Sequence, residues 1–154
     1  MIYVLKVECD DEDKSVEIGA ANNETAVITD VVVWLDTIDD DTNSKSKQML
    51  ARVDIQGQIL GRAQNAPELK DKLRKIFLWA MDFDIDTTYR KVTLVVKEDE
   101  THILRTYEFD KMFIRDYKEN YISSGEKGKS GDKPGTFKIE LTQQENQLDT
   151  IEVL

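Results

Sequence analysis

Apolar and polar residues alternate along much of this chain, which is the pattern of strands that bury one face. The clearest case is residues 49–60, where every second residue from Met49 to Ile59 is apolar or glycine. The same reasoning predicts strands at 2–8, 16–18, 26–36, 89–98, 102–109, 136–143 and 150–153. Residues 111–122 fit either a strand or a helix, and we favour a strand because Tyr and Phe are frequent there.

One segment has helical periodicity instead. Pro67 suits the first position of a helix that Asn65 or Ala66 would cap, so the pattern predicts one α-helix over residues 67–81. Its predicted core-facing residues are Leu69, Leu73, Ile76, Phe77 and Ala80. Leu78 and Trp79 fall outside this stripe, so the end of the helix needs another cover. Either a loop of the same chain or a neighbouring subunit fits that requirement.

These elements predict a mainly β protein, an antiparallel sandwich or barrel of about eight strands with one helix. The 154 residues suit a single domain, 1–154, and 40% apolar content is enough for a buried core. Two long polar loops interrupt the pattern, at 37–48 and 123–135. Loops of this length are uncommon in compact domains and are often functional.

The composition narrows the range of partners. Acidic residues outnumber basic ones by 31 to 21, which gives a net charge of −10, and the excess lies mainly in the first fifty residues. Such a field repels nucleic-acid phosphates and anionic membrane surfaces, so we expect neither as a partner. No run of about 18 apolar residues is present, so no membrane span is predicted.

The sequence contains no constellation typical of an active site. His102 is the only histidine, so a catalytic triad or a zinc site would lack its usual members. Clustered carboxylates occur at Asp36, Asp39, Asp40 and Asp41, but Ser44 replaces the glycine that a calcium loop requires. The glycines of residues 125–130 are too closely spaced for a phosphate-binding loop. We therefore expect no enzyme activity, no cofactor and no metal.

The order of the predicted elements resembles the tail-tube fold family, which includes contractile phage tails, phage-like particles and the type VI secretion tube protein Hcp. The resemblance covers about residues 26–153. It is carried by a helix with Leu69, Leu73 and Phe77, then by the strands Val92–Val96 and Leu104–Ile114. It implies a structural subunit, because members of this family close rings of six through edge strands and stack the rings head to tail.

The resemblance also implies an interface. The loop from Asp39 to Lys47 would contact the neighbouring ring, with Asp39, Asp40, Asp41, Asn43, Lys45 and Lys47 as its polar contacts. Phe109, Met112 and Phe113 would lie near the contact within the ring, and the helix residues Leu78 and Trp79 complete the predicted interface.

The expected partners are therefore copies of the same chain and other components of the particle. The expected location is the cytoplasm before assembly, then a released or secreted particle. A second hypothesis belongs to a different class: a monomeric β-sandwich binding module that holds its ligand with loops 37–48 and 123–135.

Overall fold

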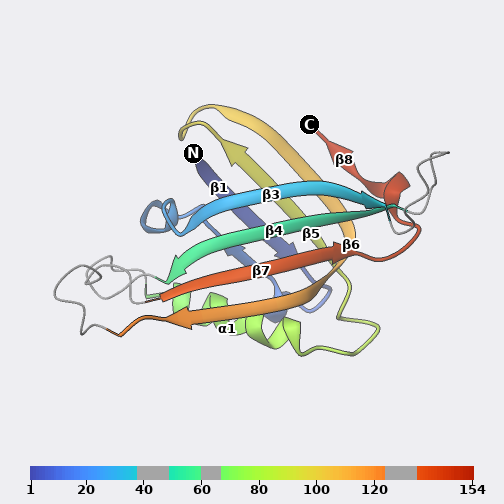
Figure 1. The fold of residues 1–154 in the computed structure, drawn as a ribbon, viewed down its shortest axis with the longest axis horizontal. Helices are drawn as coiled ribbons and strands as arrows, with labels where there is room; N and C mark the ends of the chain where they lie inside the picture. The colour runs from blue at the N-terminus through green and yellow to red at the C-terminus, as the bar shows by residue number, and fades with distance from the viewer. Residues whose placement is uncertain (38–48, 60–66, 124–134) are drawn as a thin grey trace.

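The computed structural model describes residues 1–37, 49–59, 67–123 and 135–154 (Figure 1). Its strands are β1 (Ile2–Glu8), β2 (Val16–Ile18), β3 (Ile28–Thr37), β4 (Met49–Ile59), β5 (Arg90–Lys97), β6 (Ile103–Tyr121), β7 (Gly135–Gln143) and β8 (Glu152–Val153). One α-helix, α1, spans Leu69–Ala80, and short 3-10 helices occur at Glu12–Lys14, Asn22–Glu24 and Leu148–Thr150. The predicted mainly β fold with one helix is confirmed.

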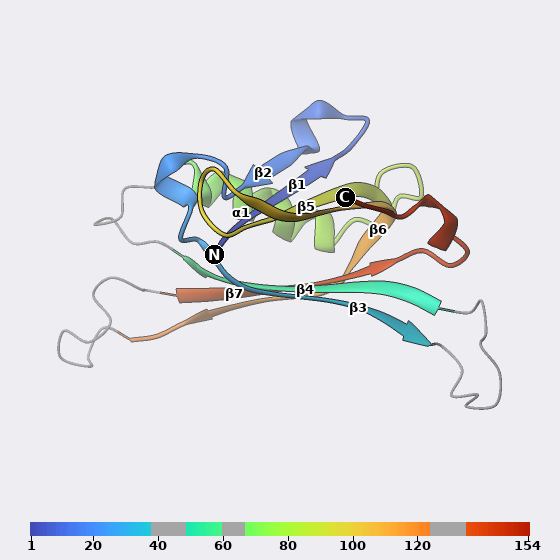
Figure 2. The same ribbon diagram turned by 90° about the horizontal axis from the view of Figure 1, so that it is seen from above.

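All the strands belong to one antiparallel sheet with the order β2-β1-β5-β6-β7-β4-β3, and β8 adds to β6. The sheet bends into two layers, with β3, β4 and β7 in one and β1, β2 and β5 in the other (Figure 2). Within the described residues it does not close into a barrel, so the bent, sandwich-like alternative is correct. The apolar core fills the space between the layers, where Leu5, Leu94, Ile55 and Ile139 are buried.

Strand β6 belongs to both layers. Its first half, to Met112, pairs with β5, and its second half, from Met112 to Tyr121, pairs with β7. The strand bends where it changes partner: Lys111 has a φ of 57°, and the β5 register shifts between Arg90 and Val92. The strand predicted at 111–122 is confirmed, but it continues the strand predicted at 102–109.

Helix α1 begins two residues later than predicted, because Pro67 and Glu68 form a turn before Leu69. The proposed caps Asn65 and Ala66 lie outside the described residues. The predicted core stripe is also wrong at its margins, because Trp79 is only 2% exposed while Phe77 is 47% exposed. On a helical wheel these two residues flank the line through Leu69 at about 80° on either side, so periodicity alone does not choose between them.

Trp79 is buried because the residues after the helix provide partners for it. Its indole Nε1 donates a hydrogen bond of 2.7 Å to the Thr88 carbonyl oxygen, and the guanidinium of Arg90 lies 5.1 Å from its ring centroid. Arg90 is itself buried and pairs with Asp82 at 3.3 Å. These contacts fix the end of α1 and the loop that follows it against the start of β5.

The other end of the helix is held by a buried charge. Glu24 is buried, and its two carboxylate oxygens accept hydrogen bonds of 2.9 and 2.7 Å from Lys72 Nζ of α1. One of the same oxygens accepts a hydrogen bond of 3.2 Å from the Gly19 amide. A buried carboxylate is tolerated only when it is paired, so this cluster ties α1 to the segment after β2.

We expect Glu24→Gln to lower the free energy of unfolding by about 2 kcal/mol, because it leaves the Lys72 ammonium without its counter-charge. Asp71→Asn is the matched control, since Asp71 forms a lysine pair on the same helix at 4.0 Å and at the surface. Its effect should stay below about 0.5 kcal/mol. Urea unfolding measures both values, and equal effects would contradict the structural role given to Glu24.

Candidate functional site

Among the described residues, the layer formed by β3, β4, β7 and the second half of β6 ends in two edges that pair with no further strand. β3 is the last strand of the sheet order and pairs only with β4. On the opposite side, β6 from Phe113 to Tyr121 pairs only with β7, since β5 reaches no further than Met112. Figure 1 shows these two edges above and below the β4–β7 pair. Unpaired backbone groups at such edges are templates for pairing with another strand.

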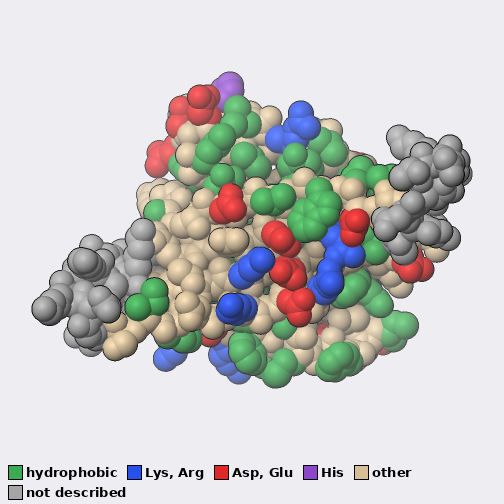
Figure 3. Space-filling model, in the orientation of Figure 1, with side chains coloured by type: hydrophobic (Ala, Val, Ile, Leu, Met, Phe, Trp, Pro, Cys, Tyr) green, Lys and Arg blue, Asp and Glu red, His purple; other side chains and the backbone are tan. Residues whose placement is uncertain are grey.

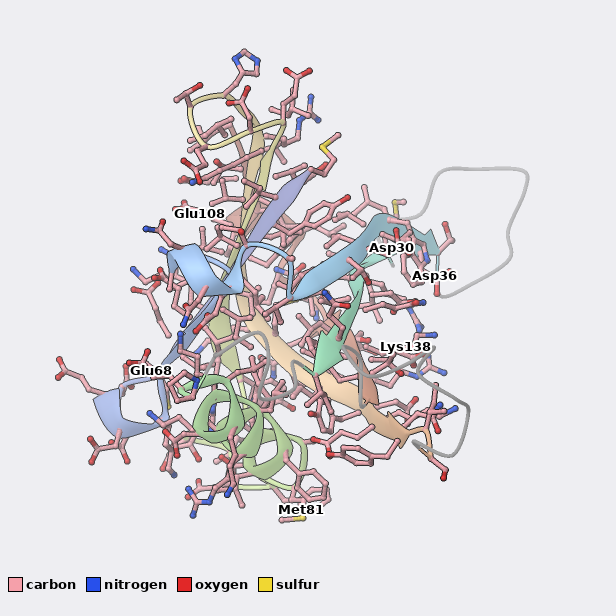
Figure 4. The ribbon with its side chains drawn as sticks, turned by 90° about the vertical axis from the view of Figure 1, so that its left-hand side faces the viewer. Asp30, Asp36, Glu68, Met81, Glu108 and Lys138 are labelled. Atoms are coloured by element: carbon pink, nitrogen blue, oxygen red, sulfur yellow. The ribbon has the colours of Figure 1, made fainter. Side chains whose placement is uncertain are left out.

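The outer face of this layer carries charged side chains in cross-strand rows (Figure 3). Asp54, Glu140 and Asp116 are neighbours across three strands. Basic groups surround this row: Lys138 Nζ lies 3.1 Å from Glu140, and Arg115 Nε lies 4.0 Å from Asp116. Asp30, Asp36 and Lys138 project to this side of the molecule in Figure 4, away from α1. The same face also carries the exposed side chains of Val32 and Trp34 on β3, so it is charged but not uniformly polar.

Two neighbouring carboxylates of the row have shifted pKa values in opposite directions. Burial, and then the charge of Glu140, raise the pKa of Asp54 above its ordinary value of 3.8. The hydrogen bond from Lys138 instead lowers the pKa of Glu140. The ionised form of Glu140 is thus stabilised, and the ionised form of Asp54 is destabilised.

The inner side of the β6 edge is aromatic. Tyr117 and Tyr121 lie on the side of the sheet that faces α1, and both hydroxyls donate hydrogen bonds of 2.7 Å to the Glu119 carboxylate between them. The ring of Phe77 meets that of Tyr117 edge-on, with 5.8 Å between the centroids. The Phe77 contact makes α1 and the free edge of β6 parts of one surface.

Exposed apolar side chains occur at the end of α1 and in the loop that follows it. Phe77 and Met81 come from the end of α1, and Phe83 and Ile85 from the loop that follows it. We call these four residues the α1 end patch. Phe83 is 92% exposed, although its loop is ordered by hydrogen bonds from the Asp84 and Asp86 amides to the side chains of Asp82 and Asp84. Figure 3 shows apolar surface along the lower margin of the molecule, and exposed apolar surface of this kind is typical of contact sites.

The residues of the predicted interface lie in different environments in the structure. Phe109, Met112 and Trp79 are buried in the core of their own chain, so their side chains are not on the surface. Phe113 is half-buried against Tyr89, and Leu78 is exposed. The loop residues lie outside the described residues: Asp39, Asp40, Asp41, Asn43, Lys45 and Lys47. The interface itself stays a prediction.

The sequence pattern predicted neither the contact between Phe77 and Tyr117 nor the exposed apolar residues Phe83 and Ile85. The pattern gave no reason to pair Phe77 with Tyr117, which is 40 residues further along the chain, because the helix–strand contact depends on the bend in β6. The exposed loop residues Phe83 and Ile85 were a usable signal, since two large apolar side chains among Asp82, Asp84 and Asp86 have no strand or helix to belong to.

Neither a metal site nor a membrane span is found in the described part of the chain. Residues 1–37, 49–59, 67–123 and 135–154 contain no group of three or more His, Cys, Asp or Glu side chains placed to share a metal ion. The helix in these ranges is too short and too polar to cross a bilayer.

No family model and no curated protein matches the sequence. Solved structures do match the fold. A crystal structure of an Hcp protein aligns with a TM-score of 0.58 at 9% identity, over 100% of this chain and 99% of that one. Hcp1 from Flavobacterium johnsoniae aligns with a TM-score of 0.52 at 14% identity, over 99% and 94% of the two chains.

A component of the anti-feeding prophage baseplate also aligns, with a TM-score of 0.52 at 10% identity, over 99% of this chain and 92% of that one. The chain therefore has the Hcp-like tail-tube fold, as the order of its elements predicted.

The raised pKa of Asp54 predicts that removing its charge stabilises the protein at neutral pH. Asp54→Asn should raise the free energy of unfolding at pH 7 by no more than about 1 kcal/mol, since solvent screens a half-exposed carboxylate. Because the pKa of Asp54 is higher in the folded state, its ionisation lowers stability as the pH rises through that value. The gain should therefore vanish at pH 3.

Urea unfolding at both pH values measures this effect. Asp30→Asn is the control, because Asp30 lies on the same face opposite Gln56 and not beside Glu140. A gain that persists at pH 3, or an equal gain from Asp30→Asn, would refute the unfavourable surroundings of the ionised Asp54, which are its burial and then the charge of Glu140.

Proposed function

We propose that this protein is a non-enzymatic subunit of the tube of a contractile, phage-tail-like or type VI-like particle. The observation that carries the proposal is the four-stranded layer with a free edge at β3 and another at the second half of β6. The shared fold with Hcp and a baseplate component supports the same class of role.

The strand directions suit repeated addition. Neighbouring strands in the layer β3-β4-β7-β6 are antiparallel, so its first and last strands run in opposite directions. When copies are related by rotation about an axis along the strands, β3 of one copy meets β6 of the next in antiparallel orientation. The sheet then continues from copy to copy with regular hydrogen bonding, and ring closure leaves no edge in this layer.

The second layer determines which side faces outward. β1, β2, β5 and α1 all cover the same face of the four-stranded layer (Figure 2). In a ring the outer circumference is longer than the inner one, so the bulkier layer belongs outside. The uncovered face, with Asp54, Glu140 and Lys138, would then line a water-filled channel, which its charges tolerate.

The number of copies, the contact between rings and the location of the subunit are proposed from the resemblance to the tail-tube family. Six copies would close the ring, in line with the 6-fold symmetrised baseplate that contains a chain of the same fold. Residues 39–47 would contact the next ring, and other particle components would bind at the ends of the tube. The subunit would be cytoplasmic before assembly and then part of a released or secreted particle.

Electron microscopy and light scattering over a concentration series test the proposal. We expect rings, and stacked tubes at high concentration, because each added copy pairs two edges. Deletion of residues 39–47 should leave rings and the circular dichroism spectrum unchanged and remove the tubes.

A monomer at every concentration, with no rings when purified particle components are added, would refute the proposal. If that monomer gained thermal stability from calcium or a glycan, the binding module would take its place. Tubes formed by the deletion variant would refute only the role of the 39–47 loop.

A further inference from the structure

The α1 end patch is not explained by pairing of the sheet edges alone. Backbone hydrogen bonds between β3 and β6 need no apolar side chains from a helix. Yet Phe77, whose ring meets that of Tyr117 on this edge, is 47% exposed, and Met81, Phe83 and Ile85 are exposed in the residues that follow it. Large apolar side chains on an ordered loop lower solubility unless something covers them.

The direction of side chains in the sheet identifies what would cover the patch. In β6, Tyr117 and Tyr121 point toward α1, while Lys118 points to the charged outer face, opposite Lys138. A strand added beside β6 continues the same alternation, since side chains of adjacent strands stand in common rows. One face of the added strand would therefore lie on the α1 side.

Strand β3 has the right side chains on the corresponding face. Val31, Val33 and Leu35 point to the side on which Ile55, Val53 and Ala51 are buried. Leu35 is nevertheless 54% exposed, because none of the described strands flanks β3 on the side away from β4. Val31 and Val33 pack partly against their own core. The edge of one copy thus offers Leu35, and the edge of another offers the exposed half of Phe77 on the same side of the sheet.

The distances agree with a direct contact. An added strand lies about 4.8 Å from β6, so its side chains would stand beside Tyr117, whose ring is 5.8 Å from that of Phe77. The exposed half of Phe77 is therefore within reach of a neighbour's β3 and out of reach of its own. Met81, by contrast, lines the groove that also holds Leu78 and Trp79.

We propose that the α1 end patch receives the inner-facing side chains of β3 from a second copy of this chain, with Phe77 and Leu35 as central contacts. This inference rests on the proposed ring, and it assigns the ring two separate contacts. Edge hydrogen bonds would set the direction of the added strand, and the apolar contact would provide much of the affinity, since burial of apolar surface drives association.

The contact region is held in shape before any partner arrives. Glu119 accepts hydrogen bonds from Tyr117 and Tyr121, which fixes the aromatic rim of β6. The loop beyond α1 is fixed by Asp82, which binds Thr87 Oγ1 at 2.7 Å and Arg90 at 3.3 Å. A site that is ordered beforehand loses less entropy on binding.

The chain offers two closely matched controls. Leu35 and Val32 are on the same edge strand with similar exposures, 54% and 48%, but they point to opposite faces. Phe77 and Leu78 are adjacent in α1 and similarly exposed, but Leu78 lines a groove with Asp13 and Lys14, on another side of the helix. Only Leu35 and Phe77 are on the side that the proposal uses.

The experiment compares Leu35→Asn with Val32→Asn, and Phe77→Asn with Leu78→Asn. The concentration of half-maximal assembly is measured by light scattering and the particles are imaged by electron microscopy. We expect Leu35→Asn and Phe77→Asn each to raise that concentration about tenfold or more, while the two controls change it less than about threefold. Phe77→Leu should assemble like the parent chain.

The outcomes separate failure of the proposed ring from failure of the contact between Phe77 and Leu35. If the parent chain forms no rings, the proposed function and this inference fail together. If it forms rings and all four asparagine variants assemble equally well, or are equally impaired, only this inference is overturned. If circular dichroism shows that Phe77→Asn is unfolded, the comparison of Leu35→Asn with Val32→Asn decides alone, and normal assembly of Leu35→Asn would overturn the inference.

Discussion

The joining of the two layers depends on strand β6, which pairs with two different partners. Its first half belongs to the layer of β1, β2 and β5, and its second half to the layer of β3, β4 and β7. The bend at Lys111 separates these halves, and Gln143 Nε2 supports it by donating to the Asp110 carbonyl oxygen at 3.0 Å. Because β5 stops at the bend, no other described strand pairs with the outer edge of the second half of β6. The feature that joins the layers also creates the candidate site.

The sequence predicted the elements well because local alternation decides them. The alternating run from Met49 to Ile59 allows only one face to be buried, and the structure buries that face. The bend in β6 was not predictable in this way, since Asp110 and Lys111 read as a break between two strands. Trp79 was misplaced for a related reason. Its burial depends on Thr88 and Arg90, which the chain brings to it only after the helix ends.

The candidate site was harder to predict than the fold, for a physical reason. An edge is defined by the strand that is missing, and alternation in β3 or β6 is the same with or without a second neighbour. Phe109 and Met112 look suitable for an interface because they are large and lie in an aromatic tract, yet the bend turns both into the core. Exposed Phe83 and Ile85 were the better signal, since their acidic surroundings exclude a place in the core.

The distribution of charge explains how such a chain avoids unwanted association. Free strand edges and an apolar patch would pair with many sheets, but both β3 and the β6 edge carry charges on the outer face, including Asp30, Asp36 and Lys118. A foreign strand would have to match these charges and also fill the α1 end patch from the correct side. A second copy of the chain meets both conditions at once, because its own β3 carries Leu35 on one face and Asp30 and Asp36 on the other. Specificity therefore follows because both faces of the added strand must fit the β6 edge at the same time.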